Sequence, residues 1–522
     1  QTVTGYGGSF PALTIDKTSG TVTFDGTCGV DSNFRYAQGT VDFTGNRTTF
    51  ILSPQDHGQN STTSADFGSG ITFYNMEVLA GYDTWDVIIS GTAIAQNLLT
   101  LTEGTVGPGT NGTIHARGNI IVGTNMGKNL DGVYDEGGLV TISGTGSQTV
   151  TGYGGSFPAL TIDKTSGTVT FDGTSGCDGP FRYAQGTVDF ATNRTTFVFT
   201  AQNHGVSASL NDIQFYNLEL NARVDPWDCD VVGTGTVTNL LTLTEGGLNA
   251  GTDGNVVAKG DLFVGTDAGI AEGFDHDGLI TLAGTATQTI TMTPGGVLPK
   301  MKVDKDNATD AVNVVGTGLD IYEDLTIWKG VLDLNGTPGL RCRDTSTHAM
   351  GSNGTLRLTG EEAVNFEAAG AFDESAGTVT FDGTDSYTSG LPNGFGDRFY
   401  HLTFNGTGRW VLDAATDVAG DFTLTDGTFD LGTTTTSQRV TITGTSSVTG
   451  TVRIAGTTAN PFDANTQPTM NAGAAVTYLG VDADTDVQVA AWSYRNLRLD
   501  NANTNFELQG ATTVRQGLTI LA

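Results

Sequence analysis

The chain has 522 residues, with 74 glycines, only 12 prolines and a formal net charge of −32 from 56 acidic and 24 basic side chains. Such a charge repels phosphate backbones and anionic lipid headgroups, which argues against nucleic-acid and membrane-surface binding. No apolar run approaches the ~20 residues of a membrane span, so we expect no membrane insertion. Glycine follows no Gly-x-y period, which excludes collagen. Abundant threonine and other β-branched residues predict a nearly all-β protein.

Two long copies of one segment follow each other from the start of the chain. Residues 1–27 return unchanged at 148–174, and NLLTLTEG at 97–104 returns at 239–246. A third, diverged copy begins with QTITM at 288. Self-similarity of this kind indicates a repeat architecture, in which each unit covers the core of its neighbour. We therefore expect four tandem units, the last two diverged and the fourth ending mid-repeat: 1–147, 148–287, 288–394 and 395–522.

A shorter unit of about 20–24 residues lies inside the long copies. The apolar pair in MEV at 76–78 is followed by LTL at 99–101, and the pair in LTF at 402–404 by FTL at 422–424. In TVTFDG at 21–26, apolar and polar residues alternate, which is the period of a half-buried strand. Glycine-containing dipeptides separate such segments at short, regular intervals and mark corners.

Two all-β architectures fit this pattern. A tandem array of β-sandwiches needs about 100 residues per domain, with varied inward-facing positions. A parallel β-helix, or β-solenoid, needs a coil of three short strands and three corners, which is the length of the short repeat. Duplication of a coil lengthens a solenoid without redesigning its core. The sequence therefore favours a parallel β-helix with about 20–24 residues per coil.

The segment FYHLTFNGTGRWVLDAATDVAGDFTLTDGTFDLG at 399–432 resembles the repeats of large secreted bacterial and archaeal surface proteins, the haemagglutinin-like and autotransporter-like β-solenoids. The resemblance implies a secreted, extracellular protein at the cell surface, in the class of adhesins, stalks, fibres and surface layers. It brings no catalytic residues. It covers most of four segments: 70–104, 212–246, 296–336 and 395–522.

Clustered aspartates are the candidate metal ligands. VDADTD at 481–486 alternates three carboxylates, and DHDG at 275–278 places two more near one another. A DxDxD pattern is typical of a calcium loop, but the glycine and the distal glutamate of that loop are missing. Aspartates at corners also form Asx turns without any metal. Calcium is the one cofactor that the sequence suggests, with these candidate ligands: Asp482, Asp484, Asp486, Asp275 and Asp277.

Two repeated sites bear on glycan binding and catalysis. Trp85 and Trp227 recur in DTWD and DPWD, where indole rings can stack on sugars or plug the core at a coil end. A polysaccharide lyase or hydrolase on a β-helix would need clustered acids and a base. The acids are spread evenly, and Arg35 and Arg182 in FRYAQG alternate with aromatic residues and so point outward. We therefore expect no enzymatic activity.

The sequence predicts a structural, non-catalytic solenoid that forms or decorates a surface fibre, filament or layer. Because the chain starts at a repeat boundary and stops inside a repeat, we expect open ends that pair with further copies, since an uncovered strand is a template. The residues of this head-to-tail contact would be Gln1, Val3, Leu518 and Ile520. The alternatives are an adhesin or phage-fibre-type stalk that binds surface glycans, and a β-helix polysaccharide lyase or hydrolase.

Overall fold

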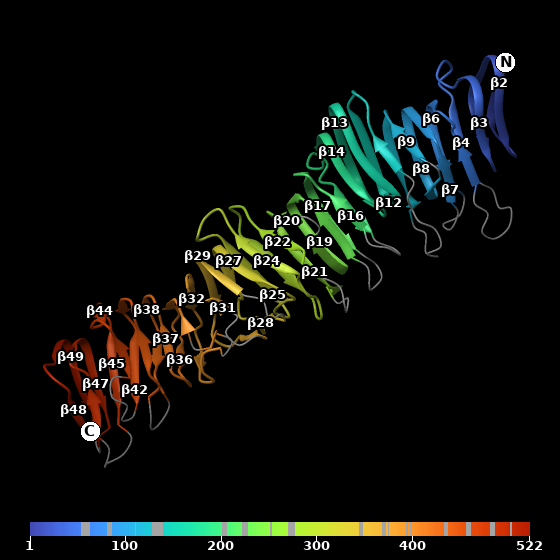
Figure 1. The fold of residues 1–522 in the computed structure, drawn as a ribbon. Helices are drawn as coiled ribbons and strands as arrows, with labels where there is room; N and C mark the ends of the chain where they lie inside the picture. The colour runs from blue at the N-terminus through green and yellow to red at the C-terminus, as the bar shows by residue number, and fades with distance from the viewer. Residues whose placement is uncertain are drawn as a thin grey trace. The chain divides into compact units, whose positions relative to one another are not determined.

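The computed structural model describes most of the chain as strands joined by short corners (Figure 1). In the described part every strand pair with a given register is parallel, as in β1–β2, β17–β19 and β42–β45. The strands stack into a β-solenoid of about 20 turns. The parallel β-helix prediction is therefore confirmed, and the sandwich alternative, which requires antiparallel sheets, is wrong. The residues outside the description are 54–62, 81–85, 110, 128–138, 201–205, 222–227, 251–252, 270–276, 344–347, 368–371, 374, 393–394, 397, 433–436, 456–460, 481–485, 502–503 and 522.

The chain divides into two compact units, Gln1–Ile280 and Thr281–Ala522. The strands up to the division are β1 (Thr2–Phe10), β2 (Leu13–Val30), β3 (Phe34–Asp42), β4 (Thr49–Leu52), β5 (Thr63–Asp66), β6 (Ile71–Leu79), β7 (Asp86–Ser90), β8 (Thr92–Pro108), β9 (Thr113–Ala116), β10 (Asn119–Met126), β11 (Leu139–Ile142), β12 (Gln148–Phe157), β13 (Ala159–Cys177), β14 (Phe181–Asp189), β15 (Thr196–Thr200), β16 (Val206–Ser209), β17 (Gln214–Asn221), β18 (Asp228–Val232), β19 (Thr234–Ala250), β20 (Asn255–Ala258), β21 (Asp261–Ala268) and β22 (Leu279–Leu282).

The strands that follow belong to the second unit. They are β23 (Gln288–Met292), β24 (Lys300–Asp304), β25 (Ala311–Gly316), β26 (Leu319–Ile321), β27 (Leu325–Asp333), β28 (Gly339–Cys342), β29 (His348–Leu358), β30 (Ala363–Phe366), β31 (Phe372–Asp373), β32 (Thr378–Phe381), β33 (Ser386–Tyr387), β34 (Arg398–Phe399), β35 (His401–Phe404), β36 (Arg409–Val411), β37 (Thr416–Val418), β38 (Phe422–Leu424), β39 (Thr428–Asp430), β40 (Val440–Ile442), β41 (Ser446–Val448), β42 (Thr451–Ala455), β43 (Phe462–Ala464), β44 (Thr469–Met470), β45 (Ala475–Leu479), β46 (Asp486–Val489), β47 (Ser493–Asp500), β48 (Asn505–Leu508) and β49 (Thr513–Leu521).

Apolar residues stack on one another at equivalent positions of successive coils. In the first unit, Phe50 pairs with Met76, Met76 with Leu99, and Leu99 with Ile120, all in parallel register. None of these four side chains is more than 1% exposed. Neighbouring strands lie about 4.8 Å apart, so each side chain contacts the one above and the one below. The core is therefore a set of continuous apolar columns that run from coil to coil.

Phenylalanine rings reinforce these columns in both long copies. Phe24 stacks on Phe43 with 4.3 Å between ring centroids, and the equivalent Phe171 and Phe190 stack at the same distance. Phe190 in turn lies 4.9 Å from Phe215. All five rings are buried. Because ring contacts between rungs add to the apolar area removed from water, an identical sequence in the next copy reproduces an identical core.

A buried lysine marks one corner of the second and third copies. Lys164 is 1% exposed, and its Nζ donates to Oε1 of Gln148 at 2.5 Å and to a backbone carbonyl at 2.7 Å. Lys305 repeats the arrangement, with 2.6 Å to Oε1 of Gln288 and 2.8 Å to a backbone carbonyl. A buried ammonium needs such hydrogen-bond acceptors to offset its lost hydration. The lysine thus links two elements by hydrogen bonds: the carbonyl groups of the corner before each copy, and the glutamine at the start of the strand that follows.

A glycine on the next rung makes room for each of these lysines. Gly186 has φ +123°, and a Cβ there would lie 2.9 Å from Cβ of Lys164. Gly330 has φ +105°, and its added Cβ would lie 2.5 Å from Cγ of Lys305. Both the backbone conformation and the space therefore demand glycine.

We expect Lys164→Met to lower the free energy of unfolding by about 1–3 kcal/mol at neutral pH, because Gln148 and a carbonyl would lose their buried donor. Burial lowers the pKa of Lys164 below its ordinary 10.5. Between the lowered value and 10.5 the unfolded chain binds more protons, so the wild type gains stability over the variant as the pH rises through this window. Urea unfolding at several pH values measures both effects.

The control for this prediction is Lys17→Met in the first copy. Lys17 is more exposed and contacts Gln1 at 3.4 Å, so its replacement should change stability much less. Equal effects of the two substitutions, or a difference that does not grow toward alkaline pH, would contradict the account of the buried corner.

Candidate functional site

The candidate calcium ligands lie partly outside the description. Asp482, Asp484 and Asp275 belong to residues that the structure does not describe, as do both candidate glycan-binding tryptophans, Trp85 and Trp227. Asp277 is half-buried beside a connection between strands, and Asp486 is exposed on β46, where its carboxylate accepts from the side-chain amide of Asn505 at 3.1 Å. Within the described ranges no three His, Cys, Asp or Glu side chains group as metal ligands would.

Two aspartates in the first unit accept hydrogen bonds from backbone N–H groups of the corner that follows them. Oδ1 of Asp42 accepts from the backbone N–H groups of Thr44 and Gly45, each at 2.8 Å, and those bonds lower the pKa of Asp42. Asp189 repeats this turn in the second copy, where the hydroxyl and the N–H of Thr192 hold its pKa down. Aspartates therefore form Asx turns without a metal at these two repeated positions.

The repeated arginines of FRYAQG point away from the core, as the alternation predicts. Arg35 and Arg182 are exposed, whereas the preceding Phe34 and Phe181 are each 1% exposed. Arg182 lies beside Thr161 of the neighbouring rung. The outward direction of both guanidinium groups is therefore confirmed.

The residues predicted to mediate assembly lie on the first and last strands of this chain. Val3 belongs to β1, which pairs with β2 through Val3 and Phe24, and Gln1 precedes it as an exposed residue. Leu518 and Ile520 belong to β49, which pairs with β47, and their side chains are 56% and 65% exposed. In the described part each of these two strands pairs with another strand on one side only.

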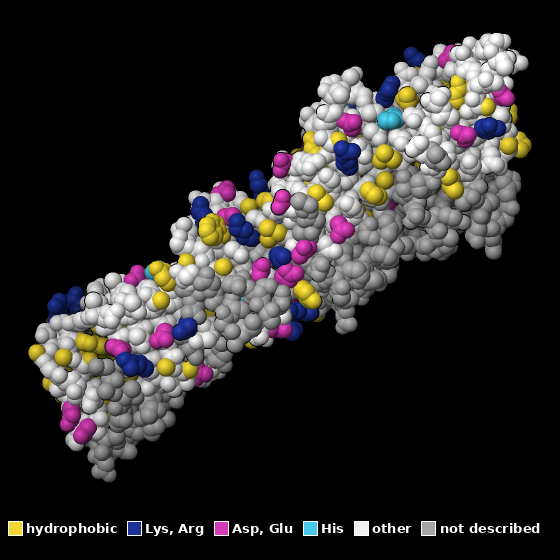
Figure 2. Space-filling model, viewed as in Figure 1, with side chains coloured by type: hydrophobic (Ala, Val, Ile, Leu, Met, Phe, Trp, Pro, Cys, Tyr) yellow, Lys and Arg dark blue, Asp and Glu magenta, His cyan; other side chains and the backbone are white. Residues whose placement is uncertain are grey.

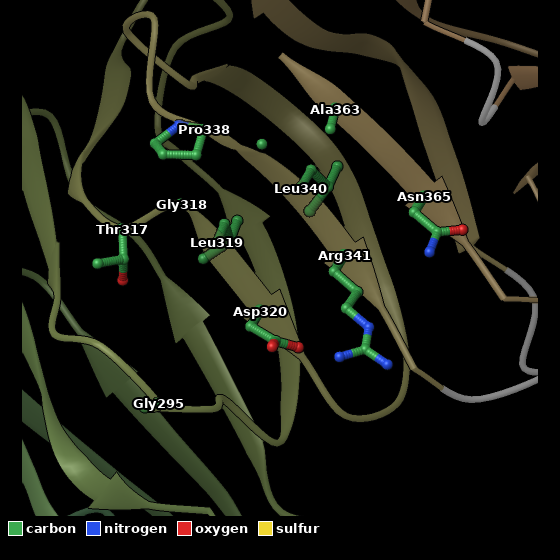
Figure 3. Close-up of a pocket in the computed structure, with 12 residues that line it drawn as sticks. Gly295, Thr317, Gly318, Leu319, Asp320, Pro338, Leu340, Arg341, Ala363 and Asn365 are labelled. Atoms are coloured by element: carbon green, nitrogen blue, oxygen red, sulfur yellow. The ribbon is translucent and has the colours of Figure 1, made fainter.

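A groove in the second unit is the concave site that Figure 3 shows in detail. It lies over β26, β28 and β30, has a volume of about 390 Å³, and is bordered by glycines and Pro338. Asp320, Arg341 and Asn365 occupy register-matched positions on the three strands. Their side chains form a polar row across the rungs, at the ~4.8 Å spacing of the strands. Leu319 and Leu340 alternate with this row and are buried.

The charged groups of the groove are held in ion pairs. Nε and Nη2 of Arg343 each donate to one oxygen of Asp320 at 2.8 Å, and the hydrogen bond to Asp320 raises the pKa of Arg343. Arg341 donates from both Nε and Nη2 to Oε1 of Glu367. Among the described residues that line the groove, Asp320 alone carries a carboxylate, whereas glycoside hydrolysis uses two. The groove can offer fixed donors and acceptors to a polar ligand.

The polar row of this groove is not evident in the sequence. Asp320, Arg341 and Asn365 are each separated by a full coil of sequence and share no motif. The signal that could have found them is the coil length, because residues one coil apart become neighbours on a parallel ladder. Trp328 is a further exposed group on this unit: its indole is 57% exposed, and Nζ of Lys302 lies 5.9 Å from its ring centroid.

No family model matches the chain, and neither a curated protein nor a solved structure matches it significantly. In the described residues there is no helix with the length and apolar character of a membrane span. The site must therefore be interpreted from its own chemistry.

We expect Asp189→Ala to destabilise the second copy at neutral pH, because the N–H groups of Ala191 and Thr192 would lose their acceptor. The lowered pKa of Asp189 in the folded chain means that its carboxylate stabilises the fold above its ordinary value of 3.8, and that this contribution is lost as the pH falls. Urea unfolding at pH 7 and near pH 3 should show the difference between wild type and variant shrinking in acid. Asp189→Asn, which keeps an acceptor oxygen, is the control and should retain most of the stability.

Proposed function

We propose that this chain is a structural, non-catalytic β-solenoid of the extracellular surface, used as a building block of a fibre, filament or layer. The observation that supports this proposal best is the like-on-like stacking of the two long copies. Rings equivalent in sequence, Phe24–Phe43 and Phe171–Phe190, make the same contact at the same distance. An architecture that grows by copying a coil suits a protein whose task is to span a distance.

The outward faces support the same role. The side-chain amide of Asn97 donates to Oδ1 of Asn75 at 2.9 Å, and Asn239 donates to Asn217 at 2.8 Å on the equivalent rungs of the second copy. Neutral hydrogen-bonded ladders of this kind stiffen the corners and stay hydrated. On the face that Figure 2 shows, charged and hydrophobic side chains are scattered singly or in small groups among other polar groups and backbone. Together with the net charge of −32, such a surface favours solubility outside the cell.

We propose further that copies associate end to end. β49 carries the exposed Leu518 and Ile520, and β1 carries Val3 with an open ladder on its other side in the described part. Pairing of β49 with β1 of another copy would continue the parallel ladder and bury those side chains. Such a contact is heterologous and does not close, so it generates filaments. Calcium would favour assembly by screening the acidic surface.

Glycan binding is the second candidate function, in the manner of an adhesin stalk. The polar row formed by Asp320, Arg341 and Asn365 favours it, because hydroxyl groups of a saccharide match donors and acceptors spaced along the rungs. The exposed indole of Trp328 offers a stacking surface elsewhere on the second unit.

Negative-stain electron microscopy of purified 1–522 at neutral pH, with and without millimolar calcium, tests the assembly. We expect filaments with a regular axial repeat. The variant Leu518→Asp/Ile520→Asp should abolish them, since charges would be buried in the contact, whereas Thr161→Asp on an internal rung should not. Single particles of one size under all conditions would refute end-to-end assembly. Glycan binding in the groove would then be the candidate function to test.

A further inference from the structure

The arginines of the second unit fall into two groups in the described part. One group contacts an aspartate or glutamate within the ion-pair distance: Arg341, Arg343, Arg357, Arg409, Arg439, Arg453 and Arg498. Arg409 and Arg453, for example, share the fully buried carboxylate of Asp430 from the rungs on either side. Arg398, Arg495 and Arg515 have no such partner in the described residues. Since acids outnumber bases more than twofold in this chain, unpaired guanidinium groups are exceptions that need a reason.

Two of these exceptions lie together in one pocket. Arg495 on β47 and Arg515 on β49 line a concavity of about 230 Å³, which extends over β44 to Thr469. Ser493 pairs with Thr513, and Tyr494 with Val514, so the two arginines that follow lie on neighbouring rungs, at a register shift between Tyr494 and Asn496. Tyr494 is fully buried, which places the residues on either side of it on the outer face of the strand.

The described lining of this pocket contains hydrogen-bond donors and no carboxylate. Besides the two guanidinium groups, the polar side chains are those of Gln467, Thr469 and Ser493. Nε of Arg495 is enclosed and has no hydrogen-bond partner in the described part. A buried donor without an acceptor costs roughly 1–3 kcal/mol, and two like charges on neighbouring rungs repel each other. Both costs disappear when an anion accepts from the two arginines.

We propose that the pocket lined by Arg495 and Arg515 binds the carboxylate of an acidic sugar. The planar fork of a guanidinium matches a carboxylate with two parallel hydrogen bonds. The hydroxyl and amide groups of Thr469, Ser493 and Gln467 lie on adjoining rungs and can bond the hydroxyl groups of the sugar ring. Three rungs span about 10 Å, which gives room for more than one inorganic oxyanion. The site is separate from the groove of Figure 3. Arg515 lies on β49, the strand of the proposed end-to-end contact, but the pocket is formed within one copy, so binding does not depend on filament formation.

Isothermal titration of 1–522 with glucuronate at low ionic strength tests this site, with glucose and inorganic sulfate as the comparison ligands. We expect saturable binding of glucuronate, at least tenfold weaker binding of sulfate, and none of glucose. Added sodium chloride should weaken the binding of glucuronate, because the interaction is between charges.

The variants Arg495→Gln and Arg515→Gln should each weaken glucuronate binding at least tenfold. Arg498→Gln is the matched control, because Arg498 lies on the same strand but pairs with Asp500 at 2.9 Å outside the pocket, and it should leave binding unchanged. Unfolding curves of the variants separate a lost site from a lost fold. Binding of sulfate as tight as that of glucuronate would reduce the pocket to a general anion site and overturn the proposal, as would equal binding by wild type and Arg495→Gln.

Discussion

The parallel backbone ladder, with strands held about 4.8 Å apart from coil to coil, is the constraint on which the rest of this structure depends. Because every rung lies directly above the previous one, a side chain packs against a side chain of similar character one coil later. This is why Phe50, Met76, Leu99 and Ile120 form one dry column. It is also why the segment 1–27 can be copied unchanged at 148–174: the surface on which the copy packs is already complementary to it.

The same ladder decides how polar groups are used. Inside, the ammonium of Lys164 is acceptable because carbonyl and amide oxygens of the preceding corner surround it. Outside, the first unit stacks asparagines, whereas the second unit pairs arginines with acidic side chains, as Arg341 with Glu367 and Arg343 with Asp320 show. Where this neutralisation stops, at Arg495 and Arg515, a pocket without carboxylates remains among the described residues. In a chain with no recognisable motif, arginines that lack an acidic partner on a neighbouring rung are therefore the best guide to binding sites.

Much of the fold could be predicted from the sequence, and most of the candidate sites could not. The alternation in TVTFDG and the spacing of the short repeat predict buried strands and a coil, because both depend on local period. Lys164 looks like a surface residue in the sequence, since its acceptors come from the corner before Gln148. The groove and the arginine pocket depend on residues one coil apart, such as Asp320 and Arg341, or Arg495 and Arg515. Coil lengths vary, and the step from Leu99 to Ile120 is shorter than the step from Ile120 to Val150, so this register is visible only in the folded chain.

The measurement that tests the stacking most directly is the distance between spin labels at Glu77 and Asp172, by double electron–electron resonance. These outward positions are joined by an unbroken series of register partners through Thr100, Ile121 and Thr151. The native cysteines are buried, so labels attach to introduced cysteines under native conditions. Four rungs of about 4.8 Å predict a narrow distribution near 19 Å, widened by the label linkers. A broad distribution centred beyond about 30 Å, as expected for residues in separate domains of about 100 residues, would contradict the solenoid.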